Sequence, residues 1–166
     1  MIDLEKISAR LRLVEDRLEI VQVIMSHPLA VDAGDADFWM DFWTEDSLMD
    51  RRAPDPEKHS GDYGGVYGKK VMREEMLSPE LEALRQAGLV HFSSVPSIHV
   101  EGDRAIATNY MQLIAQEGNS YRVRRVTISR WEFRREKSGW QIAKRTVRPV
   151  GDAEMPELAR VALKGL

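Results

Sequence analysis

Three short turns in the second half of the chain constrain the fold more than any other feature. They span residues 101–103, 117–119 and 137–139, and each contains a glycine. They separate segments over 96–100, 104–116, 121–135 and 140–150 that read as strands. Connections this short join only antiparallel neighbours. The sequence therefore predicts a meander of long antiparallel strands.

The first half of the chain has helical periodicity instead. Its apolar residues recur at steps of three and four over 4–21, and the pattern continues to Val31, where Gly34 ends it. We expect the second half of this helix to pack on its own domain, whereas the first half, to about Glu15, is free to cross onto a neighbouring subunit. Asp35 is a plausible N-cap for a short second helix that puts Phe38, Trp39 and Phe42 on one face.

Between these halves we expect a short strand over 47–52, then a loop over 53–68 rich in proline, glycine and charge that forms a lid or rim. A helix over 69–86 follows, broken at Ser78-Pro79, and a tail helix follows Pro156. Helices first and a long-stranded sheet second indicate an α+β fold. We expect a single domain over 1–166, with its core over 17–149, an N-terminal helical extension over 1–16 and the tail over 150–166.

Composition excludes several function classes. The net charge is −3, which argues against a nucleic-acid partner, and no apolar run is long enough to span a bilayer. The chain has no cysteine, so it has no disulfide, no thiolate metal site and no cysteine nucleophile. The N-terminus begins an amphipathic helix and does not resemble a signal peptide. We expect a cytoplasmic protein.

Asp32 and His91 are the candidate catalytic residues. Asp32 lies at the end of the long helix, where a negative charge is unfavourable and so suggests function. His91 lies where the helix over 69–86 gives way to the strands. A carboxylate and an imidazole beside apolar residues are sufficient to move a proton without a cofactor. If the fold does not bring them together, the chain is a binding or scaffold domain.

Other polar residues receive simpler interpretations. For His27, His59 and His99 the sequence offers no evidence of a function like that expected for His91, and we expect His59 and His99 at the surface. No usual ligand spacing appears, so we expect no metal site and no cofactor. Strand alternation places the arginines over 122–135 on two faces of the sheet, and we expect most of them to form ion pairs. Arg125 lies on the face that can reach a pocket.

Several segments together resemble the SnoaL-like branch of the nuclear transport factor 2-like superfamily. The resembling segments are 17–20, 30–35, 42–50, 66–70, 98–105, 131–135 and 139–145, together with His91. The resemblance covers roughly residues 17–149 and implies a cone, in which a curved antiparallel sheet wraps around the helices and leaves a deep pocket. In scytalone dehydratase and related enzymes of this shape an aspartate–histidine pair lines that pocket, and Asp32 and His91 match the pair.

The resemblance is incomplete elsewhere in the site. Val31 stands where scytalone dehydratase has a tyrosine, and no second histidine occurs over 109–116. Bile acid dehydratases of this shape carry an arginine late in the last strand, and Arg148 is similar in position.

These residues suggest an acid–base enzyme. His91 would take and return the proton, and Asp32 would fix its tautomer. Arg148 would hold a developing oxyanion, with Tyr67 or Tyr110 as rivals. Apolar residues would wall a pocket for a flat aromatic or polycyclic substrate, although ordinary core packing explains most of them equally well. They are Phe38, Trp39, Phe42, Met49, Met72, Met76 and Met111.

We therefore expect a cofactor-independent lyase, a dehydratase or a related eliminating or retro-aldol enzyme, or an isomerase with the same groups. The alternatives are a non-catalytic subunit like the β-subunits of aromatic-ring-hydroxylating dioxygenases, which segments 142–147 and 50–52 resemble, and a small-molecule binding module. Apolar positions on the convex sheet face, Val123 or Val126 and Ile128, predict association, with a trimer favoured over a dimer.

Overall fold

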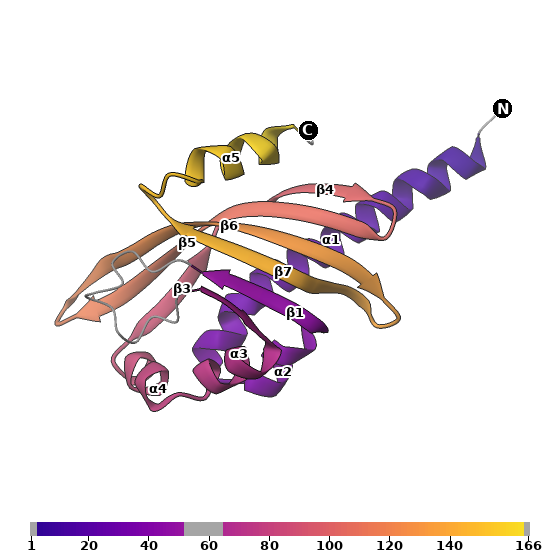
Figure 1. The fold of residues 1–166 in the computed structure, drawn as a ribbon. Helices are drawn as coiled ribbons and strands as arrows, with labels where there is room; N and C mark the ends of the chain where they lie inside the picture. Colours follow the sequence, from indigo (N-terminus) through magenta and orange to yellow (C-terminus); the bar gives the residue numbers. More distant parts are fainter. Residues whose placement is uncertain (1–2, 52–64, 165–166) are drawn as a thin grey trace.

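One curved sheet organises the protein (Figure 1). The computed structural model describes residues 3–51 and 65–164. Within them, seven strands form the sheet in the order β2-β1-β7-β6-β5-β3, and β4 also pairs with β5. The strands are β1 (Trp43–Arg51), β2 (Gly65–Gly68), β3 (Leu89–Ser93), β4 (Ser97–Glu101), β5 (Arg104–Glu117), β6 (Ser120–Glu136) and β7 (Gly139–Pro149). The expected α+β architecture is confirmed.

The predicted meander is confirmed as the antiparallel run β4-β5-β6-β7. Strand β1 extends it by pairing in parallel with β7, which places Met49 opposite Arg145. Three irregularities interrupt the pairing, between Trp43 and Leu48 of β1, between Leu113 and Ile114 of β5, and between Glu132 and Phe133 of β6. A bulge of this kind changes which side chains face inward beyond it.

Helices cover both faces of this sheet. Helix α1 (Leu4–Ala33) contacts β3, β4 and β7, and α5 (Met155–Leu163) contacts β4, β5 and β6 from the opposite side (Figure 1). Helices α2 (Ala36–Asp41), α3 (Lys69–Met76) and α4 (Pro79–Gln86) surround the open end beneath β1 and β3. The concave side of the sheet, α1 and these short helices thus enclose the interior.

The helix boundaries follow the predicted signals. Gly34 ends α1 in the left-handed region at φ 71°, and Asp35 caps α2 by accepting the Phe38 amide hydrogen at 3.0 Å. Ser78 caps α4 in the same way at the predicted break before Pro79. These caps satisfy amide hydrogens that a helix end leaves without partners.

Several expectations were wrong in detail. Strand β1 begins at Trp43 rather than at residue 47, and His91 lies within strand β3 rather than at a helix–strand junction. Phe38 is exposed although Trp39 is buried, so the aromatic residues of α2 do not share one face. Ile128, expected on an uncovered convex face, is buried. Residues 53–64 of the expected loop, His59 among them, lie outside the described residues.

The two halves of α1 have different environments. Ile20, Val23 and Ile24 belong to the core, as expected for the second half. The apolar seam of the first half is exposed and projects beyond the sheet (Figure 1). Its members are Leu4, Ile7, Leu11, Val14 and Leu18.

Candidate functional site

Asp32 and His91 meet at the mouth of the interior. Asp32 occupies the last turn of α1 and His91 the middle of β3. The His91 Nδ1 atom lies 2.6 Å from Asp32 Oδ1, and the His91 backbone N–H donates to Asp32 Oδ2 at 2.9 Å. Their side chains are 20% and 21% exposed, Asp32 being the lower. The predicted proximity is therefore observed.

This double contact determines how the imidazole is oriented. A carboxylate beside Nδ1 favours the tautomer with its proton on Nδ1, which leaves Nε2 with a free lone pair. His91 lines the cavity, and its Nε2 has no hydrogen-bond partner among residues 3–51 and 65–164. The pair can therefore act on a bound molecule through Nε2.

Arg85 of α4 holds the end of α1 that carries Asp32. Its Nε donates to the Val31 carbonyl at 2.8 Å and its Nη2 to the Met76 carbonyl at 2.7 Å. The last turn of α1 contains no basic residue of its own. Arg85 thus supplies the positive charge that a helix C-terminus favours, and it positions Asp32 without contacting the cavity.

The cavity beside the pair has a volume of about 570 Å³. Its wall is mostly apolar, and the predicted methionines Met49, Met72, Met76 and Met111 all contribute to it, as does Trp39. A cavity of this size holds a molecule of a few fused rings. The same residues also belong to the hydrophobic core, so both interpretations of them hold.

His27, for which the sequence supports no function, is a cavity residue. It is buried, lines the cavity, and packs edge-on against Trp39, Trp43 and Trp131 with ring centroids 5.0–5.8 Å away. Neither of its ring nitrogens has a hydrogen-bond partner in the described structure. Burial, followed by the positive charges of Arg145 and His91, lowers the pKa of His27 well below its ordinary value. His27 is therefore neutral. The spacing Ile20, Ile24, His27, Val31 was the signal that could have placed it on the buried face of α1.

Arg145 of β7 is the buried cation of the cavity. Its Nη2 donates to the Met111 Sδ atom at 2.6 Å and to Ser129 Oγ at 3.0 Å, and its guanidinium lies 4.1 Å from the centre of the Trp131 ring. Among the described residues it pairs with no carboxylate. Burial, above all, lowers its pKa to about 9.

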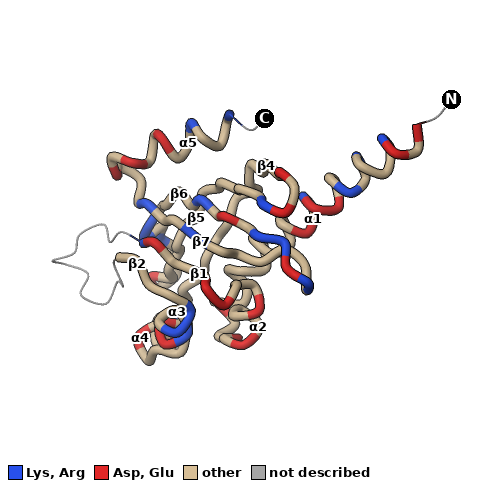
Figure 2. The backbone as a smooth tube through the Cα atoms, turned by 45° about the vertical axis from the view of Figure 1, so that its right-hand side comes forward, with Lys and Arg blue, Asp and Glu red and all other residues tan. Residues whose placement is uncertain are grey.

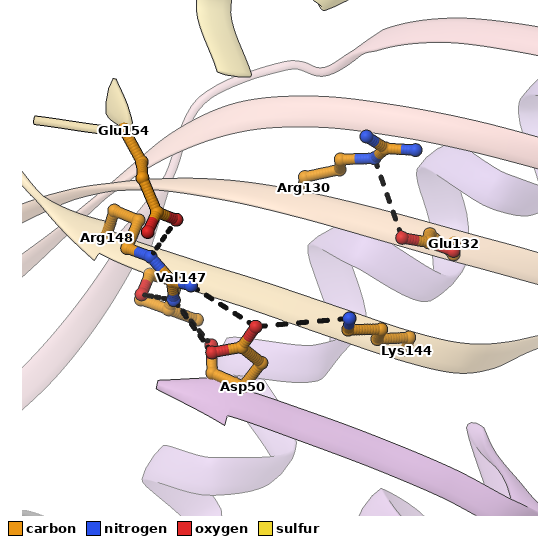
Figure 3. A network of polar contacts seen from close by, with 7 residues as sticks. All are labelled: Asp50, Arg130, Glu132, Lys144, Val147, Arg148 and Glu154. Atoms are coloured by element: carbon orange, nitrogen blue, oxygen red, sulfur yellow. Dashed lines mark hydrogen bonds and ion pairs between the residues drawn. The ribbon is translucent and has the colours of Figure 1, made fainter. Parts of the chain in front are cut away.

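Arg148, expected to hold an oxyanion, does not reach the cavity, and that prediction was wrong. Figure 3 shows it between Asp50 and Glu154, on the outer side of β7. Its Nη1 donates to Asp50 Oδ1 at 2.9 Å and its Nε to Glu154 Oε2 at 2.8 Å. These two carboxylates raise its pKa against the effect of burial. Arg148 is a structural ion-pair residue, and the arginine of β7 that lines the cavity is Arg145, three positions earlier.

A sequence profile of the SnoaL-like domain matches residues 12–146, most of the chain. This chain belongs to the SnoaL-like domain family.

Solved structures agree with the fold of this SnoaL-like domain. An NTF2-like protein with a cystatin-like fold from Novosphingobium aromaticivorans is 29% identical, has a TM-score of 0.84, and is matched over 95% of this chain and 97% of that one. A protein of the same organism described as a candidate aromatic ring hydroxylase is 23% identical with a TM-score of 0.59, over 82% and 90% of the two chains. A protein from Catenulispora acidiphila in complex with S-DNPA is 16% identical with a TM-score of 0.63, over 85% and 96%. No curated protein sequence matches significantly.

The remaining predicted residues of the SnoaL-like domain divide between the cavity and its surroundings. Met111 lines the cavity, whereas its neighbour Tyr110 is half exposed on the other side of β5, so the prediction for Tyr110 was wrong. Phe42 packs against the core and against Phe38 without lining the cavity. Tyr67 donates to Glu75 at 2.9 Å, and Glu75 in turn lines the cavity. Tyr67 therefore contacts a residue of the cavity wall but does not line the cavity itself.

Two further observations concern metals and membranes. Within 3–51 and 65–164, no three histidine, aspartate or glutamate residues gather as metal ligands. No helix in that part of the SnoaL-like domain is long and apolar enough to cross a membrane.

The neutral state of His27 predicts a pH-dependent stability. The unfolded chain protonates His27 as the pH falls through about 6.5, whereas the folded chain does not, so stability is complete above that pH and decreases below it. Between pH 7.5 and 5.5 we expect this group to lower the free energy of unfolding by on the order of 1 kcal/mol. We expect the free energy of unfolding of His27→Phe, measured with urea, to fall by that much less over this pH interval than that of the unchanged protein. Equal losses in the two proteins would contradict the neutral assignment.

Proposed function

We propose that this SnoaL-like domain is a cofactor-independent lyase that acts on a small aromatic or polycyclic molecule. The observation that carries the proposal is the 2.6 Å contact between Asp32 and His91 Nδ1 at an apolar cavity, with Nε2 unpaired among the described residues. On β7, Arg145 rather than Arg148 lines the cavity and is available to a substrate there. A fold neighbour from Catenulispora acidiphila was solved in complex with S-DNPA, which supports small-molecule binding by a protein of this fold.

A dehydration illustrates the proposed chemistry. His91 Nε2 removes a proton from carbon next to a carbonyl group, while Asp32 stabilises the imidazolium that forms. The carbon–carbon double bond forms as the carbon–oxygen bond of the β-hydroxyl breaks. The imidazolium returns its proton to that hydroxyl, which leaves as water. In an isomerisation the same base returns the proton to another carbon of the conjugated enolate. In a retro-aldol cleavage it instead takes the β-hydroxyl proton, the carbon–carbon bond breaks to release an aldehyde, and the imidazolium protonates the enolate carbon. The apolar wall keeps bulk water away in each case.

Proton abstraction can be tested before the leaving group is known. We expect the protein to speed the exchange of the acidic C–H protons of 2-tetralone, a bicyclic ketone, with D₂O, as followed by proton NMR. A panel of aromatic and steroid-like β-hydroxy ketones then separates dehydration, read from absorbance of the conjugated product, from retro-aldol cleavage, read from released aldehyde. Absence of exchange above the buffer rate for 2-tetralone and for the whole panel would contradict the proposal.

A non-catalytic scaffold resembling a dioxygenase β-subunit is the second candidate function. The fold similarity to a protein described as a candidate aromatic ring hydroxylase favours it. A scaffold needs no Asp32–His91 contact and no open cavity, and the presence of both favours the lyase. A binding module would retain small-molecule binding but show no exchange in D₂O.

We also propose that the protein forms a homotrimer. The exposed apolar seam of α1 has the spacing of a coiled-coil interface. Residues of both charge signs occur along the projecting end of this helix (Figure 2). Light scattering should give three times the chain mass of 19.0 kDa. The double substitution Leu11→Glu with Val14→Glu should reduce that mass to the monomer, and Leu29→Glu, exposed on α1 off the seam, should not. A monomer or dimer mass for the unchanged protein would contradict the trimer.

A further inference from the structure

The lining of the cavity has more positive than negative charge. Four arginines line it, against two glutamates. Arg51 is held by Glu75 through two contacts at 2.6 and 3.2 Å, and Arg124 lies 3.1 Å from Glu117. Arg145 is the most deeply buried of them and has no carboxylate beside it among residues 3–51 and 65–164. Burying a cation that forms no ion pair costs folding free energy. The presence of Arg145 at this position therefore suggests a function.

The hydrogen-bonding groups of Arg145 are also incompletely used. Both of its described hydrogen bonds come from Nη2, and its buried Nε has no partner. A guanidinium presents a planar fork that matches the two oxygens of a carboxylate. Ser129 and the Trp131 ring fix the orientation of this fork. Because Nη2 already makes two hydrogen bonds, the donors that remain are Nε and Nη1. A carboxylate is the kind of anion to which such donors bind well.

His27 adds a second unpaired group at the same end of the cavity. The Trp131 ring contacts both His27, at 5.0 Å between centroids, and the Arg145 guanidinium, at 4.1 Å. A neutral imidazole has one N–H to donate. His27 can therefore donate a hydrogen bond to a carboxylate that Arg145 binds, without adding a second buried positive charge.

The catalytic pair lies at a different part of the same cavity. Strands β7, which carries Arg145, and β3, which carries His91, are separated by β6 and β5 in the sheet. The backbones of these strands are about 14 Å apart along the sheet at the usual spacing. The Arg145 side chain crosses part of that distance, since it reaches Met111 of β5, the strand beside β3. Arg145 and His91 are thus two separate groups that line one cavity and can contact different parts of one molecule.

We propose that the substrate is an organic monoanion, a fused-ring molecule whose carboxylate is bound by Arg145 and His27 while its reacting carbon lies at His91. This inference rests on the proposed function for identifying the cavity as the substrate site. It adds the substrate class, an aromatic or polycyclic carboxylate, and assigns specificity to two residues.

Binding of two probes that differ in charge tests the inference. The probes are 2-naphthoate and its neutral analogue 2-naphthamide, measured by calorimetry and by quenching of tryptophan fluorescence. We expect the unchanged protein to prefer the carboxylate about 10- to 100-fold, as for a buried charge-assisted pair. Arg145→Met should bring the preference close to one while retaining 2-naphthamide binding, which shows that the cavity is intact. His27→Phe should reduce the preference several-fold.

Two controls separate this site from general attraction. Arg130→Met removes one positive charge from the outer side of β6, beside Glu132, and should leave the preference unchanged. The preference should also persist in 0.5 M NaCl, because a buried pair is screened little. Equal affinity for the two probes in the unchanged protein, a preference that survives Arg145→Met, or binding of neither probe would overturn the inference. His91→Asn should keep the preference, because the residue lies outside the carboxylate site. Absence of D₂O exchange in the unchanged protein, with an intact preference for the carboxylate, would refute the lyase proposal alone.

Discussion

Replacing His91 by asparagine is expected to lower turnover by about 10²- to 10⁴-fold, the usual contribution of a positioned general base. Asparagine has no group that takes a proton near neutral pH. The fold should persist, because Asp32 Oδ2 accepts the backbone N–H of residue 91 at 2.9 Å whatever the side chain is. The rate of deuterium uptake by 2-tetralone measures the loss, and thermal unfolding checks the fold.

Asp32→Asn is the companion variant, and it acts through His91. Asp32 accepts two hydrogen bonds, from the backbone and the ring of His91, whereas an asparagine amide offers one oxygen and one NH₂ group. The NH₂ group would face Nδ1 and favour the tautomer whose proton is on Nε2, so Nε2 could no longer act as the base. We expect a loss comparable to that of His91→Asn. His99→Asn, at an exposed position of β4, is the matched histidine control. It should exchange the 2-tetralone protons at the rate of the unchanged protein. Unchanged turnover in His91→Asn would remove this residue from the mechanism.

Sequence periodicity was sufficient to predict most of the fold. The glycine turns over 101–103, 117–119 and 137–139 delimit strands β4 to β7 to within one or two residues. The break at Ser78-Pro79 and the caps at Gly34 and Asp35 follow from local backbone chemistry alone. The proximity of Asp32 and His91 is a long-range contact, and only the family resemblance predicted it.

The error at Arg148 has an identifiable physical cause. Trp140 and Ile142 face the interior, and simple alternation from them would turn residues 144, 146 and 148 inward. The irregularity opposite Glu132 and Phe133 inserts one extra residue in β7, so that Arg145 and Val147 face inward beyond it instead. A bulge depends on pairing between strands, and no local signal in β7 marks it. His27 was missed for another reason. Its spacing places it on the buried face of α1, but the same spacing is typical of a histidine in the core and does not indicate a cavity.

The same bulge leads to a contrast in stability between two arginines on one strand. Arg145→Met is expected to raise the free energy of unfolding by about 1–2 kcal/mol near pH 7. Removing a buried, uncompensated cation recovers a desolvation penalty of several kcal/mol. Against it stand the loss of contact with Trp131, about 2 kcal/mol at most, and of the hydrogen bond to Ser129. Methionine also suits the neighbouring wall of Met49 and Met111.

Arg148→Met, three residues further along β7, should have the opposite effect. That guanidinium is 6% exposed and binds both Asp50 and Glu154, so its removal leaves the less exposed carboxylate, Asp50, without its main partner. We expect a loss of about 2–4 kcal/mol, near the range for breaking a buried pair after allowing for the solvent that reaches Glu154. Urea unfolding of the two variants at pH 7 compares them directly. The lowered pKa of Arg145 fixes the sign of its effect, because the penalty exists only while the group is charged, below about pH 9, and fades as the pH rises further. If both variants lost stability equally, Arg145 would be an ordinary structural residue, and the argument that its charge is retained for a bound anion would fail.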